Sequence, residues 1–334
     1  MTDLALVTGA TGFVGSALCR TLVDSGMGVR ALHRPSSSLK NLEGLSLDFF
    51  EGDILDRARM DQACVNVRWV FHTASNAAYW RNPASVKQTA VEGTRNVAEA
   101  ALAAGVERLV FTSSIAAMGL PAGSEFLTEA HRFNLREDQF PYGAAKYQAE
   151  LALHEIIGRG LDAVIVNPTI ILGPGDVNLI SGSLVTEAAR GMGFFYLAGG
   201  GNYIHIDDVA AGHLAAAEHG QCGQGYILGG ENLAHKDAFT ILNQVVGRPP
   251  PWLKIPGWVV PPAAWLIDRL RRWIQIPIDG DQLRMSRAYL YCDIAKAQKE
   301  LLRDKPISFR RAVEDAYRWY LQEGIIPSRK PKKP

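Results

Sequence analysis

Tyr142 and Lys146 are the residues of this sequence whose types and spacing best suit proton exchange with a carbonyl oxygen. They stand four positions apart in the run Pro-Tyr-Gly-Ala-Ala-Lys, and residues at i and i+4 share one face of a helix. A tyrosine with its ordinary pKa of about 10 is a poor acid or base at neutral pH. A nearby ammonium group favours the phenolate and lowers that pKa, which would make the proton exchange practical.

The position of this pair gives it weight, because the same spacing arises by chance on exposed helices. Upstream of it, residues 108–114 read Arg-Leu-Val-Phe-Thr-Ser-Ser, which is typical of a buried strand that ends in hydroxyl side chains. A hydroxyl at that strand end could hold the same substrate oxygen as Tyr142. The sequence therefore predicts a site where a hydroxyl, a phenol and an ammonium group meet one carbonyl.

Three glycines near the start of the chain predict a site for a bound anion. Residues 4–7 form a short apolar run typical of a strand buried on both faces, and residues 16–23 carry a helical spacing. Gly9, Gly12 and Gly15 lie between them. Such glycines let the backbone approach a pyrophosphate, while the free N–H groups and the dipole of the helix favour its charge. The spacing differs from the commoner G-x-G-x-x-G fingerprint, and a plain structural turn is the alternative.

The loop after the second predicted strand, residues 29–33, indicates which dinucleotide would bind. In a dinucleotide-binding fold this strand end meets the adenosine ribose, where an acid would bind the 2′-hydroxyl of NAD. Residues 33–40 contain no acid but hold Arg34, Lys40 and three serines. Arg34 would suit a 2′-phosphate as a charge-assisted partner, so we expect NADPH as the cofactor, with NAD as the alternative. An ordinary polar loop is the other interpretation.

Further strands alternate with helices in the first half of the chain. Residues 49–54 read as a third strand, at whose end Asp53 would meet the adenine, and residues 69–75 as a fourth that ends in small side chains. A helix is expected over residues 92–100. This alternation predicts an α/β fold with a Rossmann-type, doubly wound parallel sheet. His72 could be a catalytic base, but we favour a structural ring with hydrogen-bonded nitrogens.

Composition and charge exclude several classes of function. Of the 334 residues, 47% are hydrophobic and 21% are charged, and the net charge of +1 gives no reason to expect nucleic acid as a partner. The four cysteines lie far apart and form no C-x-x-C, which predicts a reduced, metal-free, cytoplasmic protein. The chain enters a predicted strand at once and has no apolar run of about 18 residues, so neither a signal peptide nor a membrane span is expected.

The order of these motifs resembles the extended short-chain dehydrogenase/reductases of the NAD-dependent epimerase/dehydratase family. The motifs that carry the resemblance are Thr8-Gly-Ala-Thr-Gly-Phe-Val-Gly15, Gly52-Asp53, Gly93-Thr94, Thr112-Ser-Ser114, Tyr142-Gly-Ala-Ala-Lys146 and Tyr203-Ile-His-Ile-Asp-Asp-Val-Ala210. One position departs from the family pattern, because Ala90 stands where an asparagine is usual. A hydrogen bond on the cofactor side is therefore lost or supplied by Thr89.

The resemblance implies roles for individual residues. Ser114 would orient the substrate carbonyl, Tyr142 would act as the acid or base, and Lys146 would lower the pKa of Tyr142 and hold the nicotinamide ribose. The glycine turn and the strand ends would hold the cofactor through Gly9, Thr11, Gly12, Phe13, Val14, Gly15, Arg34, Asp53, Ile54, Thr73, Ala74, Ser75, Thr112, Tyr142, Lys146 and Pro168. No residue is expected to bind a metal.

Within the family, the chain is similar to the dihydroflavonol-4-reductase-like branch. Residues 164–174 read Val-Ile-Val-Asn-Pro-Thr-Ile-Ile-Leu-Gly-Pro, where sugar-nucleotide epimerases typically have an Arg-Tyr-Phe-Asn-like segment. Arg34 matches the NADPH-selecting feature of this branch, and residues 226–232 are similar to bacterial members found with hopanoid biosynthesis. The resemblance implies an NADPH-dependent oxidoreductase that reduces a ketone or aldehyde to an alcohol, or catalyses the reverse. A sugar-nucleotide epimerase or dehydratase with bound NAD is the alternative enzyme, and a dinucleotide-sensing protein is the alternative without turnover.

The second half of the chain would build the substrate side. We expect a Rossmann domain over residues 1–170 and a smaller, mainly helical substrate-binding domain over residues 171–334, with about 203–230 returning to the Rossmann core. The expected partner is a small-molecule carbonyl or alcohol, bound by a monomer or homodimer. Two short motifs in this half read as structural.

The first of these motifs is the glycine run at 199–201, which reads as a turn because no helix start follows it. The second is His205-Ile-Asp207-Asp208. Its side chains could form a metal or acid/base cluster, but we favour Asp207 or Asp208 as the cap of a helix over residues 209–219.

Residues 249–277 differ in composition from the rest of the chain. They contain a triple proline and four of the seven tryptophans, namely Trp252, Trp258, Trp265 and Trp273. Apolar residues keep a helical spacing at Leu266, Leu270, Trp273 and Ile274, opposed by Arg269, Arg271 and Arg272. The segment is a helix packed on the domain, an apolar lid over the substrate, or a peripheral membrane contact through 252–276.

The charges of the second half argue against a nucleotide sugar as substrate. Its second pyrophosphate would need clustered cations or a helix N-terminus, and Arg190, Arg248 and Lys254 are scattered in the sequence. The segments expected to line the site are aromatic: Tyr79-Trp80, Phe194-Phe195-Tyr196 and the tryptophans from 252 to 273. Such walls favour a predominantly apolar carbonyl compound.

Overall fold

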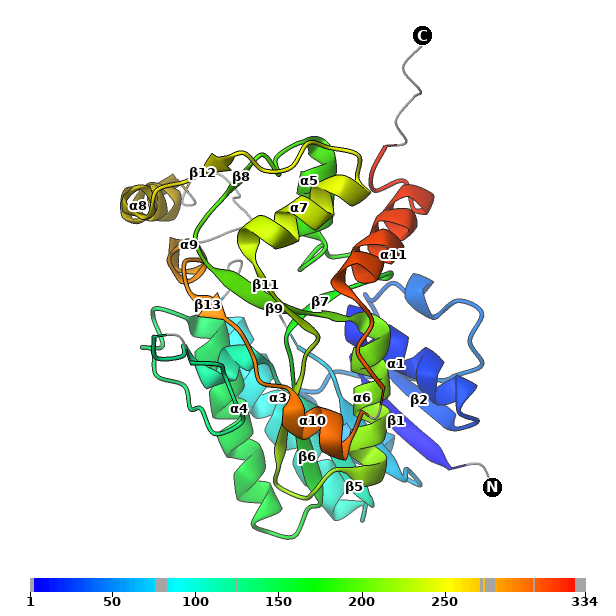
Figure 1. The fold of residues 1–334 in the computed structure, drawn as a ribbon. Helices are drawn as coiled ribbons and strands as arrows, with labels where there is room; N and C mark the ends of the chain where they lie inside the picture. Colours follow the sequence, from blue (N-terminus) through cyan, green and yellow to red (C-terminus); the bar gives the residue numbers. More distant parts are fainter. Residues whose placement is uncertain are drawn as a thin grey trace.

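A seven-stranded parallel sheet forms the centre of the protein, with helices on both faces (Figure 1). The computed structural model describes residues 3–75, 83–123, 125–270, 273, 280–302 and 304–327. The strands follow the order β10-β6-β5-β4-β1-β2-β3. Their bounds are β1 Leu4–Thr8, β2 Gly28–His33, β3 Asp48–Glu51, β4 Trp69–His72, β5 Arg108–Thr112, β6 Ala163–Pro168 and β10 Gly225–Leu228. This sheet confirms the predicted Rossmann-type α/β fold.

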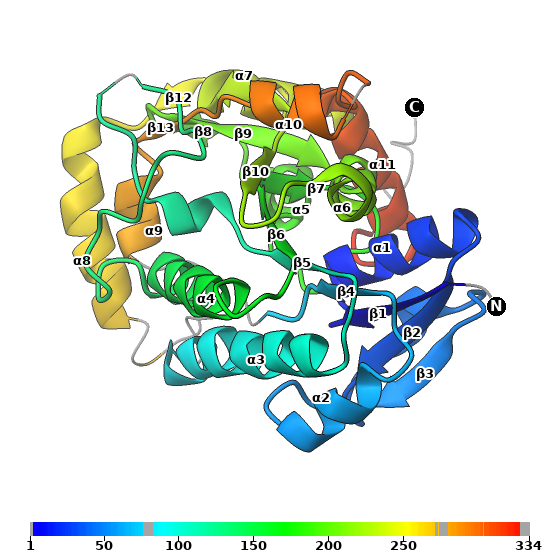
Figure 2. The same ribbon diagram turned by 90° about the horizontal axis from the view of Figure 1, so that it is seen from below.

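Helices cover the two faces of the sheet because its strands are apolar on both sides. Figure 2 shows α2 (Arg57–Ala63), α3 (Pro83–Ala103) and α4 (Pro141–Ile157) on one face, and α1 (Phe13–Asp24) and α6 (Ile206–His219) on the other. In β1, Leu6 belongs to the core under α3 and α4, while Ala5 and Val7 belong to the core under α1 and α6. The continuous apolar run at the start of the chain is therefore a strand buried on both faces, as predicted.

The carboxyl ends of all seven strands lie at one edge of the sheet because every neighbouring pair is parallel. The strand order reverses between β1 and β4, which is where ligands bind in doubly wound folds. The third and fourth strands end earlier than predicted, at Glu51 and His72. Strand β3 ends before Asp53 because the chain turns there. The Asp53 carboxylate accepts the Leu55 N–H at 2.9 Å, a hydrogen bond typical of a turn.

The C-terminal part is mainly helical, as predicted. It contains α5 Ser183–Arg190, α7 His235–Val245, α8 Val260–Leu270, α9 Gly280–Met285, α10 Ala295–Glu300 and α11 Phe309–Gln322. Small sheets join β7 Ile170–Leu172, β9 Gly200–His205, β11 Glu231–Ala234 and β13 Tyr289–Leu290, and pair β8 Phe195–Tyr196 with β12 Leu253–Lys254. Short 3₁₀ helices are η1 Lys40–Leu42, η2 Ile115–Met118 and η3 Gly257–Val259. In the part of the chain that the structure describes, no helix has the length and apolarity that a bilayer-spanning segment needs.

The glycine run near residue 200 starts a strand, so the predicted turn is wrong. Gly200 and Gly201 begin β9, which pairs with β11 and β13. A Cβ on Gly200 would lie 2.6 Å from the Tyr291 ring and 2.7 Å from the Leu233 carbonyl oxygen. Glycine is needed here because neighbouring groups approach the strand closely, which sequence spacing alone does not reveal.

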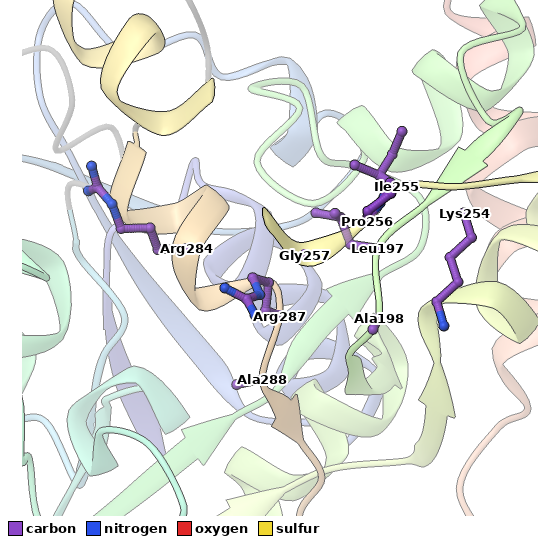
Figure 3. A pocket seen from close by; sticks show the side chains of 9 residues that line it. All are labelled: Leu197, Ala198, Lys254, Ile255, Pro256, Gly257, Arg284, Arg287 and Ala288. Carbon is purple, nitrogen blue, oxygen red and sulfur yellow. The ribbon is translucent and has the colours of Figure 1, made fainter. Parts of the chain in front are cut away.

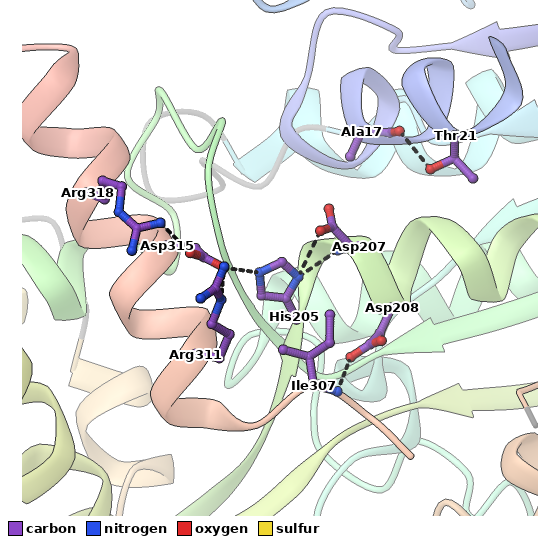
Figure 4. A network of polar contacts seen from close by, with 9 residues as sticks. All are labelled: Ala17, Thr21, His205, Asp207, Asp208, Ile307, Arg311, Asp315 and Arg318. Atoms are coloured by element: carbon purple, nitrogen blue, oxygen red, sulfur yellow. Dashed lines mark hydrogen bonds and ion pairs between the residues drawn. The ribbon is translucent and has the colours of Figure 1, made fainter. Parts of the chain in front are cut away.

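His205, and not an aspartate, caps α6, so the predicted cap is also wrong. The His205 Nδ1 accepts the Asp207 N–H at 3.0 Å (Figure 4). Asp208 instead accepts the Ile307 N–H at 2.8 Å. The other ring nitrogen of His205 lies 3.6 Å from the Asp315 carboxylate of α11, and the imidazole is buried between the two helices. The histidine takes the cap because α11 holds its ring at the end of β9.

Candidate active site

The start of α1 forms a cradle for an anion. No side chain caps this helix and no acidic residue lies in its first turn, so its first N–H groups lack intrahelical partners. Gly9 has a φ of +67°, and a Cβ there would lie 2.6 Å from the Ala74 Cα. A Cβ on Gly15 would overlap the Gly9 carbonyl oxygen. Glycine at position 9 therefore lets the turn pack against the loop after β4, and glycine at position 15 lets α1 begin beside the Gly9 carbonyl. A helix start of this kind, with free N–H groups, is typical of a phosphate-binding site.

Hydroxyl groups hold the loop after β4 against the glycine turn. The Thr73 hydroxyl donates to the Thr8 carbonyl oxygen at 2.7 Å, and the Ala74 N–H donates to the Thr8 hydroxyl at 3.3 Å. Ser75 follows as an exposed residue. The other predicted cofactor residues lie at the same edge: Thr11, Phe13 and Val14 at the start of α1, Thr112 at the end of β5 and Pro168 at the end of β6.

Two predicted adenosine-side residues lie beyond β2 and β3. Arg34 directly follows β2 and is exposed, and no described residue forms a hydrogen bond or ion pair with its guanidinium. Asp53 is half-buried beyond β3, next to the buried Ile54. Asn96, which the sequence analysis missed, donates its amide to the Ile54 carbonyl oxygen at 3.0 Å and fixes this loop against α3.

The structure brings Ser114, Tyr142 and Lys146 together at the sheet edge. Ser114 follows β5, and Tyr142 is the second residue of α4; the two hydroxyls are hydrogen-bonded, and Ser75 is a second partner of the phenol. The buried Lys146 donates its Nζ to the Thr112 carbonyl oxygen at 2.8 Å. A helix that begins at the carboxyl edge thus places a phenol and an ammonium group beside a strand-end serine.

Burial has the largest effect on the acidity of this group. It raises the pKa of Tyr142, and the hydrogen bonds from Ser114 and Ser75 oppose that rise. The direction is opposite to the one expected from the Tyr-x-x-x-Lys spacing, because the cost of a buried phenolate outweighs the groups that favour it. Burial also lowers the pKa of Lys146 to about 8, against the opposing charge of Glu150.

Glu150 and Asn167 extend the site and were missed by the sequence analysis. The Asn167 amide donates to the Glu150 carboxylate at 2.8 Å and to the Ser114 carbonyl oxygen at 3.2 Å. Glu150 lies one helical turn after Lys146 on α4, and burial raises the pKa of its carboxyl group. The spacing of four residues between Lys146 and Glu150 is the sequence feature that could have revealed Glu150. Asn167, which lies in β6, holds the backbone of Ser114 in place through its hydrogen bond to the Ser114 carbonyl oxygen.

Two buried histidines, His72 of β4 and His213 of α6, form hydrogen bonds behind the site. The His72 ring lies between the hydroxyls of Thr8, at 2.8 Å, and Thr94, at 3.1 Å, which confirms the prediction of a hydrogen-bonded structural ring. The His213 Nδ1 donates to the Val209 carbonyl oxygen at 2.7 Å, so its Nε2 accepts the Thr112 hydroxyl at 2.7 Å. Burial lowers the pKa of His72 to about 3 and that of His213 to about 4.

We expect His213 to make the protein less stable in mild acid. Because its pKa is about 4 in the folded state and about 6.5 unfolded, only the unfolded chain binds a proton between these values. The contribution of His213 to the free energy of unfolding is complete above about pH 6.5 and is lost as the pH falls toward 4. In urea unfolding across this window, His213→Gln should flatten the pH dependence by about 1.4 kcal/mol per pH unit. Equal slopes for the two proteins would show that His213 takes up its proton in the folded state.

A cavity of about 660 Å³ lies beside η3 and α9 (Figure 3). Its lining residues are Leu197, Ala198, Lys254, Ile255, Pro256, Gly257, Arg284, Arg287 and Ala288. Three of them are cations and none is acidic. This finding corrects the interpretation that the cations of the second half are scattered, because Arg284 and Arg287 join Lys254 here. Of the other expected cations, Arg190 pairs with Glu187, and Arg248 donates to the Ala189 carbonyl oxygen at 2.8 Å.

The aromatic residues expected around the substrate are only partly placed by the structure. Tyr79 and Trp80 lie outside the described residues. Phe194 and Phe195 are partly exposed, and Trp252 stacks on Phe194 with the ring centroids 6.2 Å apart. These side chains form an aromatic surface next to the short β8–β12 sheet.

Known proteins share this fold over nearly the whole chain. The crystal structure of gox2253 matches with a TM-score of 0.86 and 37% identity, covering 97% of this chain and all of that one. A nucleoside-diphosphate-sugar epimerase from Pseudomonas aeruginosa matches with a TM-score of 0.83 and 25% identity, covering 98% of this chain and 100% of that one.

The curated relatives include reductases. A Synechocystis sp. protein provisionally named a dihydroflavonol 4-reductase is 34% identical, covering 98% of this chain and 97% of its own. Sterol demethylase protein B of Methylococcus capsulatus is 32% identical, with 96% and 99% covered. Cinnamoyl-CoA reductase 1 of Oryza sativa is 31% identical, with 74% and 77% covered. A family model matches residues 5–229, which span the glycine turn, the Ser114–Tyr142–Lys146 group and β10. The chain therefore belongs to the NAD dependent epimerase/dehydratase family.

Proposed function

We propose that this protein is an NADPH-dependent oxidoreductase that reduces the ketone or aldehyde of a largely apolar substrate to an alcohol, or catalyses the reverse. The observation that carries the proposal is the hydrogen-bonded pair Ser114–Tyr142 beside the buried Lys146, at the edge where the glycine turn lies. The names of the Synechocystis and Oryza relatives as reductases support it. We assign the dinucleotide to residues 1–170 and the substrate to residues 171–334, with about 203–230 packed on the Rossmann core.

The side chains have distinct roles in this proposal. The Tyr142 phenol gives its proton to the substrate oxygen, and Ser114 holds the same oxygen by a hydrogen bond. The raised pKa of Tyr142 keeps the phenol protonated at neutral pH but makes it a weak acid, so the proton transfer depends on stabilisation of the phenolate. The charge of Lys146 stabilises the phenolate that remains, and Asn167 keeps Ser114 in position. NADPH, when bound, supplies the hydride that the carbonyl carbon receives.

The cofactor would lie along the carboxyl edge of the sheet. The turn of Gly9, Gly12 and Gly15 would hold the pyrophosphate, Asp53 would meet the adenine, and Arg34 would bind the 2′-phosphate. The Arg34 guanidinium is exposed and has no partner among the described residues, so it can take an anionic partner without breaking an existing ion pair.

A sugar-nucleotide epimerase or dehydratase is the second candidate, and the cationic cavity favours it. Lys254, Arg284 and Arg287 could bind the pyrophosphate of a nucleotide sugar. They could equally bind one acidic group of an otherwise apolar carbonyl compound. We favour the second possibility because the nearby Phe194, Phe195 and Trp252 offer an aromatic surface to rings or alkyl chains.

Thermal-shift titration of the NADPH-loaded protein distinguishes the two candidates. We expect stabilisation by polycyclic or aromatic ketones, more by those that carry a carboxylate, and none by UDP-sugars or dTDP-sugars. Arg287→Gln should remove the advantage of the carboxylate while leaving the response to neutral ketones. Stabilisation by nucleotide sugars that is lost in Arg287→Gln, without any response to ketones, would favour the epimerase.

A further inference from the structure

Three tryptophans stand exposed on one helical segment. Trp258 in η3 is 76% exposed, Trp265 in α8 is 61% exposed, and Trp273, just beyond α8, is 84% exposed. Leu266 and Leu270 of the same helix are 47% and 39% exposed. Large apolar side chains gathered in this way on a surface mark a site of interaction rather than a folding requirement.

Three side chains share one face of α8, and two tryptophans flank it. Positions 265, 266 and 269 fall on one side of the helix at 3.6 residues per turn, and Trp258 and Trp273 are exposed just before and just beyond it. The opposite stripe packs inward through Val260 and Ala264, which are 2% and 0% exposed. We call Trp258, Trp265, Leu266, Arg269 and Trp273 the tryptophan face. The polarity of an ordinary surface helix is reversed here, since the aromatic side chains point to solvent.

The tryptophan face carries positive charge at its centre. The Arg269 guanidinium lies over the Trp265 ring, 5.8 Å from its centroid. The sequence predicted Arg269 on the side of the helix opposite its apolar residues, and this prediction is wrong. Arg269 and Trp265 are four positions apart and therefore lie on one face of α8. Arg271, Arg272 and Ile274 of that prediction lie outside the described residues.

An ion pair and a hydrogen bond fix the segment to the next helix. Asp268, the acidic residue of α8, accepts the Gly280 N–H at 2.8 Å and pairs with Arg284 at 3.3 Å. The acid is thus already bound within the protein and does not offset the charge of Arg269. Figure 1 shows α8 at the periphery, away from the seven-stranded sheet.

We propose that the tryptophan face docks on the surface of a bilayer that contains anionic lipids. Tryptophan suits the boundary between headgroups and acyl chains, because its ring is apolar and its N–H can stay hydrated. A helix that combines tryptophan and leucine with arginine is typical of interfacial binding. An acidic headgroup complements the Arg269 guanidinium, whose charge Asp268 does not offset because it pairs with Arg284.

A second copy of the chain fits this face less well. A twofold dimer places the same patch of both copies together, so Arg269 would approach its own counterpart. Like charges across an interface weaken it, whereas a bilayer with anionic headgroups attracts the Arg269 guanidinium. The docking is independent of the proposed reaction, and it would bring the substrate region to the phase in which apolar compounds dissolve.

Vesicle flotation of the full chain tests this proposal. We expect the protein to bind phosphatidylcholine vesicles that contain phosphatidylglycerol more strongly than phosphatidylcholine alone, with a blue shift of tryptophan emission and weaker binding at high salt. Trp258→Ser/Trp265→Ser should lower the partition coefficient about tenfold or more. Arg269→Glu should lower it by about tenfold on the anionic vesicles alone.

Leu151→Ser is the matched control, since it removes a leucine of α4 that is 47% exposed and lies outside the tryptophan face. It should bind vesicles like the unmodified protein. Absence of flotation with both vesicle types would overturn the proposal. So would a dimer in sedimentation velocity that dissociates in Trp258→Ser/Trp265→Ser while vesicle binding is absent, because the face would then cover a second copy.

Discussion

Replacing Tyr142 by phenylalanine is expected to lower turnover about a hundredfold or more while NADPH affinity stays nearly unchanged. The change removes the hydroxyl that pairs with Ser114 and leaves the ring that packs at the start of α4. The substrate oxygen then loses its proton donor, but the glycine turn is untouched. Steady-state kinetics with a ketone or aldehyde that the enzyme reduces measures the turnover. NADPH titration followed by fluorescence measures the cofactor affinity separately.

Tyr147→Phe is the matched control for this experiment. Tyr147 belongs to the same helix, and its ring stacks on Phe133 with the centroids 6.0 Å apart. We expect this variant to keep its turnover. If Tyr142→Phe also kept normal turnover, the assignment of the Ser114–Tyr142–Lys146 group would be wrong. A loss of NADPH binding in its place would indicate that the phenol has a structural role.

Arg34→Asp is expected to change the ratio of kcat/KM for NADPH over NADH by about ten- to a hundredfold in favour of NADH. The unmodified protein should prefer NADPH because Arg34 can donate charge-assisted hydrogen bonds to the 2′-phosphate, and each is worth about 1.5 to 3 kcal/mol. An aspartate at the end of β2 repels that phosphate and can accept the hydroxyl of NADH. Initial rates with both cofactors give the ratio directly.

Arg20→Asp controls for the charge change, because Arg20 is an exposed residue of α1 away from the end of β2. It should leave the cofactor ratio unchanged. Equal use of NADPH and NADH by the unmodified protein would contradict the role of Arg34. A similar shift in both variants would mean that long-range charge, and not the contact at β2, sets the preference.

The sequence predicts the sheet well because its strands and turns depend on local rules. A strand buried on both faces needs a continuous apolar run, which residues 4–7 show. The turn that follows needs a glycine with positive φ at position 9. The i+4 spacing of Tyr142 and Lys146 likewise places both side chains at the carboxyl edge once α4 begins there.

Features that depend on contacts between distant segments cannot be predicted from local sequence patterns. His205 caps α6 because Asp315, far along the chain, lies beside its ring. The cationic cavity needs Lys254 and Arg287 brought together by β12 and the residues after α9. Burial raises the pKa of Tyr142, whereas the Tyr-x-x-x-Lys spacing predicted a lowered pKa. The spacing does not reveal this shift because it does not show that the phenol is buried.

The central claim, a net reduction with NADPH, is tested most directly by following an isotope. The protein is incubated with a panel of apolar ketones and aldehydes and with NADPH that carries deuterium at the transferred position. The masses of the products are then measured by mass spectrometry. We expect an alcohol that carries one deuterium, formed in equal amount to the NADP⁺, and formation of that alcohol about a hundredfold slower or more with Tyr142→Phe. Conversion of a nucleotide sugar without net use of the dinucleotide, together with no labelled alcohol from any carbonyl compound, would contradict it.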